Sequence, residues 1–393
     1  YGKLEGRQEV PAITTTATGT FAVTVDPNAL ILVAHANTDA VNTVAAHLHD
    51  EFAGANGGVA IGLVQDVNDA SRWSAINAPL TAGQLTAIRA GRYYVNVHTM
   101  ANPGGEVRGQ VAPAPVEVLI TDMSGAEEVP ANASANSAIA ATTVNRDTGD
   151  LTIHVNGIGV DNASGVHIHD GYAGQNGSVV VPLTVDLANA SHWSATGVVL
   201  DSAGLDAYRE GRFYVNLHTP AIPAGELRGQ LVPEDIHVLF SAMDGNQVVP
   251  PVVTAADALA ATTANLATRN FVAFLNANGA DNAISAGIHT GGVGANGAEI
   301  LPLAQTPTDA GQWSGIEAQL SDDDWSSYRA GRLYALIATP GNMNGEVRGQ
   351  IVPPDAALFD DQAPTVTLTN PGSPVSGTVT LDATASDDQA VSI

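Results

Sequence analysis

The stretch GRYYVNVHTMANPGGEVRGQV, residues 91–111, recurs twice further along this chain. Its second occurrence is GRFYVNLHTPAIPAGELRGQL (211–231), and its third is GRLYALIATPGNMNGEVRGQI (331–351). After the leading Gly-Arg, the first two occurrences alternate in polarity, which predicts a β-strand. The spacing of 120 residues is too long for a solenoid unit and has the size of a domain. The sequence therefore predicts three tandem domains, called copies one, two and three below.

A short helix is predicted immediately before this stretch. In LTAGQLTAIRAGR (80–92), Thr81 is a suitable N-cap, Leu85 and Ile88 fall on one face, and Gly91 is a suitable helix end. The third copy has SDDDWSSYRAGR (321–332), with acidic residues in the first turn, where the helix dipole favours them. We expect one such helix in each copy.

The rest of each copy has the pattern of an all-β domain. TGTFAVTVD (18–26) and DLTIHVNGI (150–158) alternate apolar and polar residues, and Asn-Gly dipeptides mark tight turns. We predict three antiparallel β-sandwich or Greek-key barrel domains, with Trp73, Trp193 and Trp313 as core anchors. Proline-rich joints suggest domains at residues 1–114, 115–234 and 235–355, followed by a linker and a further segment at 356–393.

The composition excludes several classes of protein. The 393 residues carry 40 Asp and Glu against 14 Lys and Arg, a net charge of −26, which argues against nucleic acid and anionic membranes as partners. There is no cysteine for disulfides or thiolate sites. No apolar run approaches the roughly 20 residues of a membrane helix. The composition is typical of a secreted β protein.

A His-x-His pattern points to metal chemistry in copies one and two. In AAHLHD (45–50), strand alternation places His47 and His49 on one face, and YYVNVHT (93–99) places Asn96 and His98 on one face. If Leu48 faces the core, the three imidazoles gather on the other side of the sheet. Three imidazoles suit copper, with zinc as the alternative. The predicted metal ligands are His47, His49 and His98 in copy one, and His167, His169 and His218 in copy two.

Several alternatives stay open for these residues. The histidines could instead be hydrogen-bonding groups on an exposed sheet face, or form another polar binding site. Asp50 and Asp170 follow the His-x-His and could be further ligands, hydrogen-bond acceptors for a ligand, or turn-capping residues. Copy three has Gly287 and Ala338 at two of the histidine positions and Leu336 at the asparagine position, so we expect no metal there.

The sequence also suggests roles for three further groups of charged and histidine residues. Glu106, Glu226 and Glu346 are predicted to pair with arginines of their own domains. The acidic runs Asp322–Asp324, Asp360–Asp361 and Asp387–Asp388 could bind calcium near domain joints. The other histidines, His35, His154, His192 and His237, do not repeat at the 120-residue spacing and are assigned no role.

The combined pattern of His-x-His, Trp-Ser, Gly-Arg-x-Tyr-Val-Asn-x-His-Thr and Gly-Glu-x-Arg-Gly-Gln resembles the CHRD domain, named for its occurrence in chordin. The resemblance covers residues 1 to about 354 and implies an extracellular β domain. The His-x-His strand also resembles that of Cu/Zn superoxide dismutases, themselves Greek-key barrels, although no bridging histidine is found at a matching position. APTVTLTNPGSPVSGTVTLDATASDDQAVSI (363–393) resembles the first half of a bacterial Ig-like repeat, which implies a longer natural protein.

Two functions are compatible with these observations. The first is a secreted or cell-surface structural protein, such as a stalk, matrix component or filament subunit, with metal sites in two domains. It would associate with itself or with other cell-surface proteins, through strand edges and terminal segments. The alternative is a copper or zinc protein for metal storage, electron transfer or redox chemistry. A hydrolase is disfavoured because the sequence lacks G-x-S-x-G, H-E-x-x-H and a repeated Ser/His/Asp set.

Overall fold

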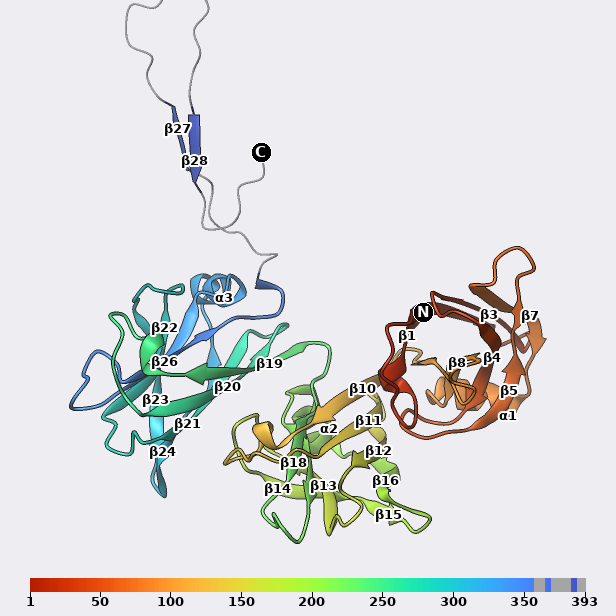
Figure 1. Cartoon of the computed structure of the whole chain (residues 1–393), viewed down its shortest axis with the longest axis horizontal. Helices are drawn as coiled ribbons and strands as arrows, with labels where there is room; N and C mark the ends of the chain where they lie inside the picture. Colours follow the sequence, from red (N-terminus) through yellow and green to blue (C-terminus); the bar gives the residue numbers. More distant parts are fainter. Residues whose placement is uncertain (357–364, 369–382, 387–393) are drawn as a thin grey trace, which may run out of the picture. The chain divides into compact units, whose positions relative to one another are not determined.

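The computed structural model describes residues 1–356, 365–368 and 383–386. Each copy is an antiparallel β domain with one short α-helix, so the predicted all-β class with three tandem domains is confirmed (Figure 1). Contacts within the chain divide it into a first unit, Tyr1–Ile236, and a second unit, His237–Ile393. Copies one and two therefore belong to the first unit, and copy three belongs to the second from His237 onward.

The elements follow the same order in all three copies. Copy one contains β1 (Gly2–Glu5), η1 (Gly6–Gln8), β2 (Thr18–Asp26), β3 (Ile31–Thr38), β4 (Thr43–Asp50), β5 (Gly58–Gly62), β6 (Val64–Gln65), β7 (Arg72–Pro79), α1 (Ala82–Arg89), β8 (Tyr93–Thr99) and β9 (Val107–Gln110). Copy two contains β10 (Val116–Met123), η2 (Gly125–Glu127), β11 (Ser137–Asn145), β12 (Asp150–Ile158), β13 (Gly165–Asp170), β14 (Ser178–Pro182), β15 (Thr184–Asp186), β16 (Asn189–Val199), α2 (Ser202–Arg209), β17 (Phe213–His218) and β18 (Leu227–Gln230). Copy three contains β19 (Ile236–Met243), η3 (Gly245–Gln247), β20 (Asp257–Asn265), β21 (Asn270–Asn278), β22 (Ser285–Thr290), β23 (Glu299–Thr306), β24 (Asp309–Gln319), α3 (Asp322–Arg329), β25 (Leu333–Ala338) and β26 (Val347–Ile351).

The strand order shows that each copy is a barrel. In copy one the order is β5-β4-β8-β9-β1-β2-β3-β7-β6, and β5 and β6 are separated by a single residue, so the two ends of the sheet meet (Figure 1). In copy three the single strand β23 pairs with both β22 and β24. The other side is closed by Glu5 opposite Arg108, by Ser124 opposite Arg228 and by Asp244 opposite Arg348. Closure removes exposed sheet edges.

Apolar side chains that alternate along the strands fill each barrel. Trp73, Trp193 and Trp313 are buried in the three cores, as predicted. Leu48 and Val95 lie in the core of copy one, in neighbouring strands β4 and β8. Burial of such side chains stabilises a fold by about 1.5–3 kcal/mol each. Because strand side chains alternate, the histidines of these strands lie on the opposite, outer face of the sheet.

The predicted helix of copy one is confirmed with its caps. The Thr81 hydroxyl accepts from the Gln84 backbone N–H, and the Gln84 side chain accepts from the Thr81 N–H, which together form a capping box. Ile88 is buried against the core. Gly91 ends the helix with a φ of +75°, a conformation that favours glycine.

The predicted Glu–Arg pairs are wrong. The Glu106 carboxylate accepts hydrogen bonds from the Thr15 hydroxyl (2.5 Å), the Thr99 hydroxyl (2.9 Å) and the Asn102 amide. The carboxylates of copies two and three are likewise held by hydroxyl and amide groups, from Ser134, Asn136 and Thr219 to Glu226, and from Thr254, Thr339 and Asn342 to Glu346. These neutral donors satisfy the carboxylate, so no arginine is needed beside it.

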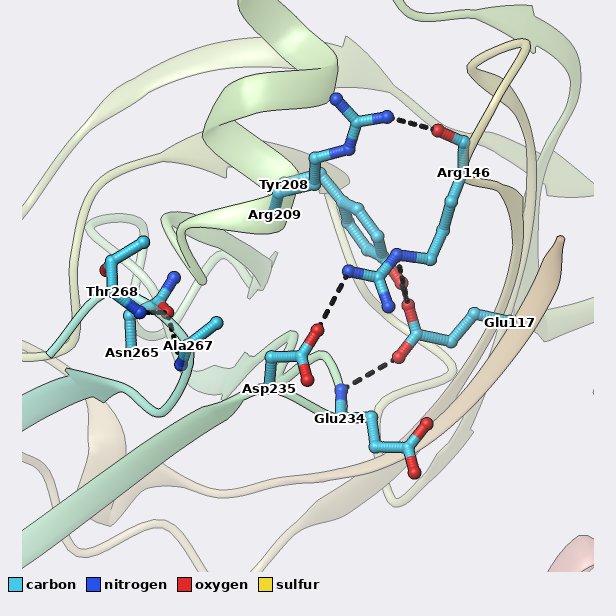
Figure 2. Close-up of polar contacts among 9 residues, drawn as sticks. All are labelled: Glu117, Arg146, Tyr208, Arg209, Glu234, Asp235, Asn265, Ala267 and Thr268. Atoms are coloured by element: carbon cyan, nitrogen blue, oxygen red, sulfur yellow. Dashed lines mark hydrogen bonds and ion pairs between the residues drawn. The ribbon is translucent and has the colours of Figure 1, made fainter.

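The proline-marked joint after copy two is tied to the body of that copy (Figure 2). Glu117 of β10 accepts from the Tyr208 hydroxyl (2.8 Å) and from the backbone N–H of Glu234 (2.8 Å), and it lies 3.7 Å from Arg146. Arg146 also pairs with Asp235 at 3.2 Å. Both polar residues of the joint are therefore anchored to β10 and to the turn after β11.

The segment after copy three is described only in part. Strands β27 (Thr365–Leu368) and β28 (Ala383–Ser386) pair in antiparallel fashion, and this alone does not support the predicted Ig-like repeat. Asp360–Asp361 and Asp387–Asp388 lie outside the described residues. In α3, Asp322 pairs with Arg269. Among the described residues, no helix is both long and apolar enough to cross a membrane.

Candidate metal centre

The three predicted histidines of copy one come together on adjacent strands. In the β4–β8 pairing, His47 lies opposite Asn96, and Ala45 lies opposite His98. Ligand nitrogens of His47, His49 and His98 all lie within 4.8 Å of one another, and the same holds for His167, His169 and His218 in copy two. These are the two groups of histidine or carboxylate side chains among the described residues that could hold a metal ion.

The spacing of the nitrogens suits a metal ion. His47 Nδ1 and His98 Nε2 are 3.1 Å apart. Two imidazole nitrogens bound at 2.0–2.1 Å to one tetrahedral ion lie about 3.3 Å apart. The separation in the structure is therefore close to the one that ligation requires, and small side-chain movements would be enough to reach it.

Backbone carbonyls fix the tautomers of two of these histidines. His49 Nδ1 lies 3.0 Å from the Gly57 carbonyl oxygen, and His98 Nδ1 lies 3.1 Å from the Pro103 carbonyl oxygen. A carbonyl accepts only from N–H, so both rings carry their proton on Nδ1 and present the lone pair of Nε2. Such hydrogen bonds behind a ligand are typical of metal-binding histidines.

Copy two repeats this arrangement and leaves its ring nitrogens unsatisfied. His169 Nδ1 faces the Gly177 carbonyl at 3.0 Å, and His218 Nδ1 faces the Pro223 carbonyl at 3.1 Å. Three ring nitrogens are buried with no hydrogen-bond partner among the described residues: His167 Nδ1, His169 Nε2 and His218 Nε2. Three converging buried lone pairs without a partner are costly in a folded protein, and a bound cation would satisfy all three.

The histidines are held in the form that binds metal. Burial lowers the pKa of His47, His49 and His98, because removal from water disfavours the charged imidazolium. Burial also lowers the pKa values of the three equivalent histidines of copy two, His167, His169 and His218. All six are therefore mainly neutral at pH 7, so no imidazolium has to lose its charge before it ligates. His47 donates from Nδ1 to His98 Nε2, and it binds through Nδ1 once its proton moves to Nε2.

A stack of three side chains supports His49. Its ring lies on the Tyr94 ring, with centroids 5.0 Å apart and planes 7° apart, and the Arg108 guanidinium lies 3.4 Å from the Tyr94 centroid. Arg108 donates to the carbonyls of Ala55 (2.8 Å) and Phe52 (3.0 Å). The stack thereby holds the loop that carries the Gly57 carbonyl, the partner of His49. The sequence analysis missed this role of Arg108 and Tyr94.

A buried glutamate beside the histidines was also missed. Asn96 donates from its amide to Glu9 Oε2 at 3.2 Å, and Asn216 donates to Glu128 Oε2 at 3.2 Å in copy two. Burial raises the pKa of both Glu9 and Glu128 to about 7. The sequence did contain a signal for this glutamate. Glu-Val-Pro occurs in copies one and two, and copy three, which lacks the triad, has Val248 in place of the glutamate.

Copy three shows which histidine the fold itself retains. His289 stacks on Tyr334, with centroids 5.2 Å apart, so it keeps the place of His49 in the stack. The Glu299 carboxylate lies 3.8 Å from His289 Nε2. A Cβ atom at Gly287 would lie 2.5 Å from Glu299 Oε2. A glutamate thus fills the position that the His47 ring occupies in copy one, and Ala338 replaces His98.

Asp50 and Asp170 do not join the histidine groups. Asp50 pairs with Arg92 at 3.1 Å, and Asp170 makes two hydrogen bonds to Arg212, at 2.9 and 2.6 Å. Their carboxylates are thus engaged by arginines that follow the helices. Of the roles considered for them, direct ligation has the least support from these contacts.

Two of the remaining histidines do occupy equivalent positions, contrary to the sequence analysis. His35 lies opposite Ser74 and His154 opposite Ser194, so they match at a spacing of 119 residues. His154 Nδ1 lies 3.0 Å from His192 Nε2, and His192 Nδ1 lies 3.3 Å from Asp186. His35 lies 38 residues before Trp73, whereas His154 lies 39 residues before Trp193, and this shift of one residue concealed the repeat.

Comparison with curated proteins and with solved structures gave no match. The family comparison matched the CHRD domain three times, at residues 2–111, 119–231 and 239–351. These segments make up most of the chain and contain both histidine groups. The domain boundaries at residues 114, 234 and 355 stay predictions. The chain therefore belongs to the CHRD domain family and carries three tandem copies of the domain.

Proposed function

We propose that copies one and two each bind one transition-metal ion, copper in the first place and zinc as the alternative. The observation that carries this proposal is the convergence of three ring nitrogens, with carbonyls behind two of them that fix Nε2 as the free atom. His47 would bind through Nδ1, and His49 and His98 through Nε2. The equivalent atoms of His167, His169 and His218 would bind the second ion.

Copper is favoured over zinc by the donor set. The ligand group consists of imidazole nitrogens alone, and copper(II) has the highest affinity for such ligands among first-row divalent ions. Zinc with three histidines and an open position is also a common arrangement. Bound copper would add one-electron chemistry, and the protein would supply the rigid strands, the fixed tautomers and the half-buried surroundings.

We further propose that the chain is a secreted or cell-surface structural protein, such as a stalk, matrix component or filament subunit. Its membership of a family that occurs in extracellular proteins and its tandem β domains support this role. Metal storage or electron transfer without a structural role is the alternative. Fractionation of the source cells would locate the protein, and removal of the metal would show whether assembly needs it.

The metal proposal is tested by equilibrium titration of the full chain with copper, followed by removal of loose metal and elemental analysis. We expect two ions per wild-type chain, one in His98→Ala or His218→Ala, and none in the double variant. His289→Ala is the matched control, because this histidine stacks on Tyr334 as His49 stacks on Tyr94 but has no triad, and it should leave two ions bound. Two ions retained in the double variant would refute the assignment.

A further inference from the structure

Copies one and two make a close contact inside the first unit, and it is centred on a glycine. The Gly54 carbonyl accepts a hydrogen bond from the Asn156 side chain at 2.8 Å. A Cβ atom at Gly54 would lie 2.7 Å from the Ala141 Cβ and 2.8 Å from the His154 Cβ. Only glycine allows this approach, and its φ of +84° also favours glycine. We call residues 52–55 the tip loop of copy one.

The receiving surface on copy two is the outer face of β11 and β12. Ala141 lies directly opposite His154 in the strand pairing, and Asn156 lies two residues further along β12. Ala141 is 2% exposed and His154 is 7% exposed, although both are on the outside of their own barrel. We call these three residues the seat of copy two. Ala53 of the tip loop is 2% exposed.

Copy one carries the same seat on β2 and β3. Ala22 lies opposite His35, and Asn37 lies two residues further along β3. All three are exposed, and they line or border an open groove of about 880 Å³ that also includes Lys3 and Arg72. The Asn37 side-chain oxygen accepts from Ser71, at 3.1 Å, and no hydrogen bond among the described residues uses its amide N–H groups. The donor that binds a tip loop in copy two is thus available in copy one.

Copy three carries the same tip loop, at residues 292–295. Gly294 has a φ of +77°, close to the +84° of Gly54, and no atom of the described residues lies within 4 Å of the position of a Cβ there. Val293, at the position of the buried Ala53, is 85% exposed. An exposed valine beside a glycine with positive φ has the shape and polarity of the loop that copy one inserts between the barrels.

We propose that the tip loop of copy three docks on the seat of copy one in a second molecule of this protein. The Gly294 carbonyl accepts from the Asn37 side chain, as the Gly54 carbonyl accepts from Asn156 within the chain. Asp66 also lines the groove and Arg72 pairs with Asp69, so the charges there nearly cancel, and the contact depends on shape and on the Asn37 hydrogen bond. Tip and seat are different surfaces, so the contact is head-to-tail; repeated without closing into a ring, it forms an open filament. It does not involve the histidine triads.

Two variants test this association in the full chain. Gly294→Asn adds a side chain to the tip loop at a point where a Cβ displaces no atom of the described residues, and asparagine tolerates positive φ. Ala22→Gln fills the seat on an exposed strand position. Gly197→Asn is the matched control, because Gly197 also has a positive φ (+66°) and open space around its Cβ position.

The mass of each protein is measured by analytical ultracentrifugation between about 10 µM and 1 mM, a range that detects weak association. We expect the mean mass of the wild type and of Gly197→Asn to rise beyond a dimer, and each of the two other variants to stay monomeric. An equal mixture of Gly294→Asn and Ala22→Gln should form a dimer that grows no further, because one intact tip and one intact seat remain. This recovery also shows that both variants are folded.

A wild type that stays monomeric over the whole range would overturn the proposal. So would wild-type association that Gly294→Asn and Ala22→Gln leave intact, since such a contact would use other surfaces. Failure of the mixture to associate, or growth of either variant alone to the size of the wild type, would equally contradict it.

Discussion

Replacement of Arg108 by methionine should lower the unfolding free energy of copy one by more than the loss of a surface charge does. The guanidinium donates to the carbonyls of Ala55 and Phe52 and to the Gln110 side chain, at 2.8, 3.0 and 3.2 Å. Hydrogen bonds to a charged group contribute about 1.5–3 kcal/mol each, or about 4.5–9 kcal/mol for three. Burial of the cation, which lowers the pKa of Arg108 to about 10, offsets about 3 kcal/mol of this. We therefore expect a net loss of about 1.5–6 kcal/mol.

Hydrogen exchange measured by mass spectrometry is the suitable assay, since it reports the opening free energy of each copy separately. Amides of β8 should exchange faster in Arg108→Met, and those of copy three should not change. Arg72→Met is the control in the same copy, because Arg72 is 66% exposed and pairs with Asp69 at the surface. Its effect should stay within about 0.5 kcal/mol. A loss below about 1 kcal/mol for Arg108→Met, or equal losses for both variants, would refute the reasoning.

Three further predictions follow from the site and its surroundings. Hydrogen bonds from Asn102, Thr15 and Thr99 lower the pKa of Glu106 below its ordinary 4.5. The ionised carboxylate therefore contributes its full stabilisation above pH 4.5, and this is lost as the pH falls through the lowered pKa. Urea unfolding at pH 7 and pH 3.5 should show a smaller difference in stability for Glu106→Gln than for the wild type. The pKa values of the six triad histidines are lowered, so metal affinity should be nearly constant above about pH 6.5 and fall below it, as measured by titration with a competing chelator. The triple variant Gly287→His, Ala338→His and Glu299→Val should bind a third metal ion per chain; a count that stays at two would mean that more than the triad is needed.

The fold could be predicted because its signals are local and repeated three times. Alternation along the strands, the capping residues Thr81 and Gly91, and the 120-residue spacing each have a direct structural consequence. The histidine group was predictable for the same reason, since His47 and His49 share a strand face and His98 needed only the assumption that β4 and β8 are neighbours. The core residue Leu48 fixed which face they share.

The surroundings of the site could not be predicted, because they depend on chain segments that only folding brings together. Thr15 reaches Glu106 across 91 residues, and Glu9 reaches Asn96 across 87. Strand alternation correctly places Glu106 and Arg108 on one face, but it does not say that hydroxyl groups and backbone carbonyls satisfy them separately. Charge complementarity in the sequence was therefore a poor guide to these partners.

Anomalous X-ray diffraction from crystals of the copper-loaded protein would locate the metal ions themselves. If both triads bind copper, each chain has two anomalous peaks, one about 2.0–2.2 Å from His47 Nδ1, His49 Nε2 and His98 Nε2, and one at the equivalent atoms of copy two. No peak is expected at His289 in copy three. The absence of peaks at both triads, or peaks at His154 and His192 in their place, would contradict the assignment of the triads as metal sites.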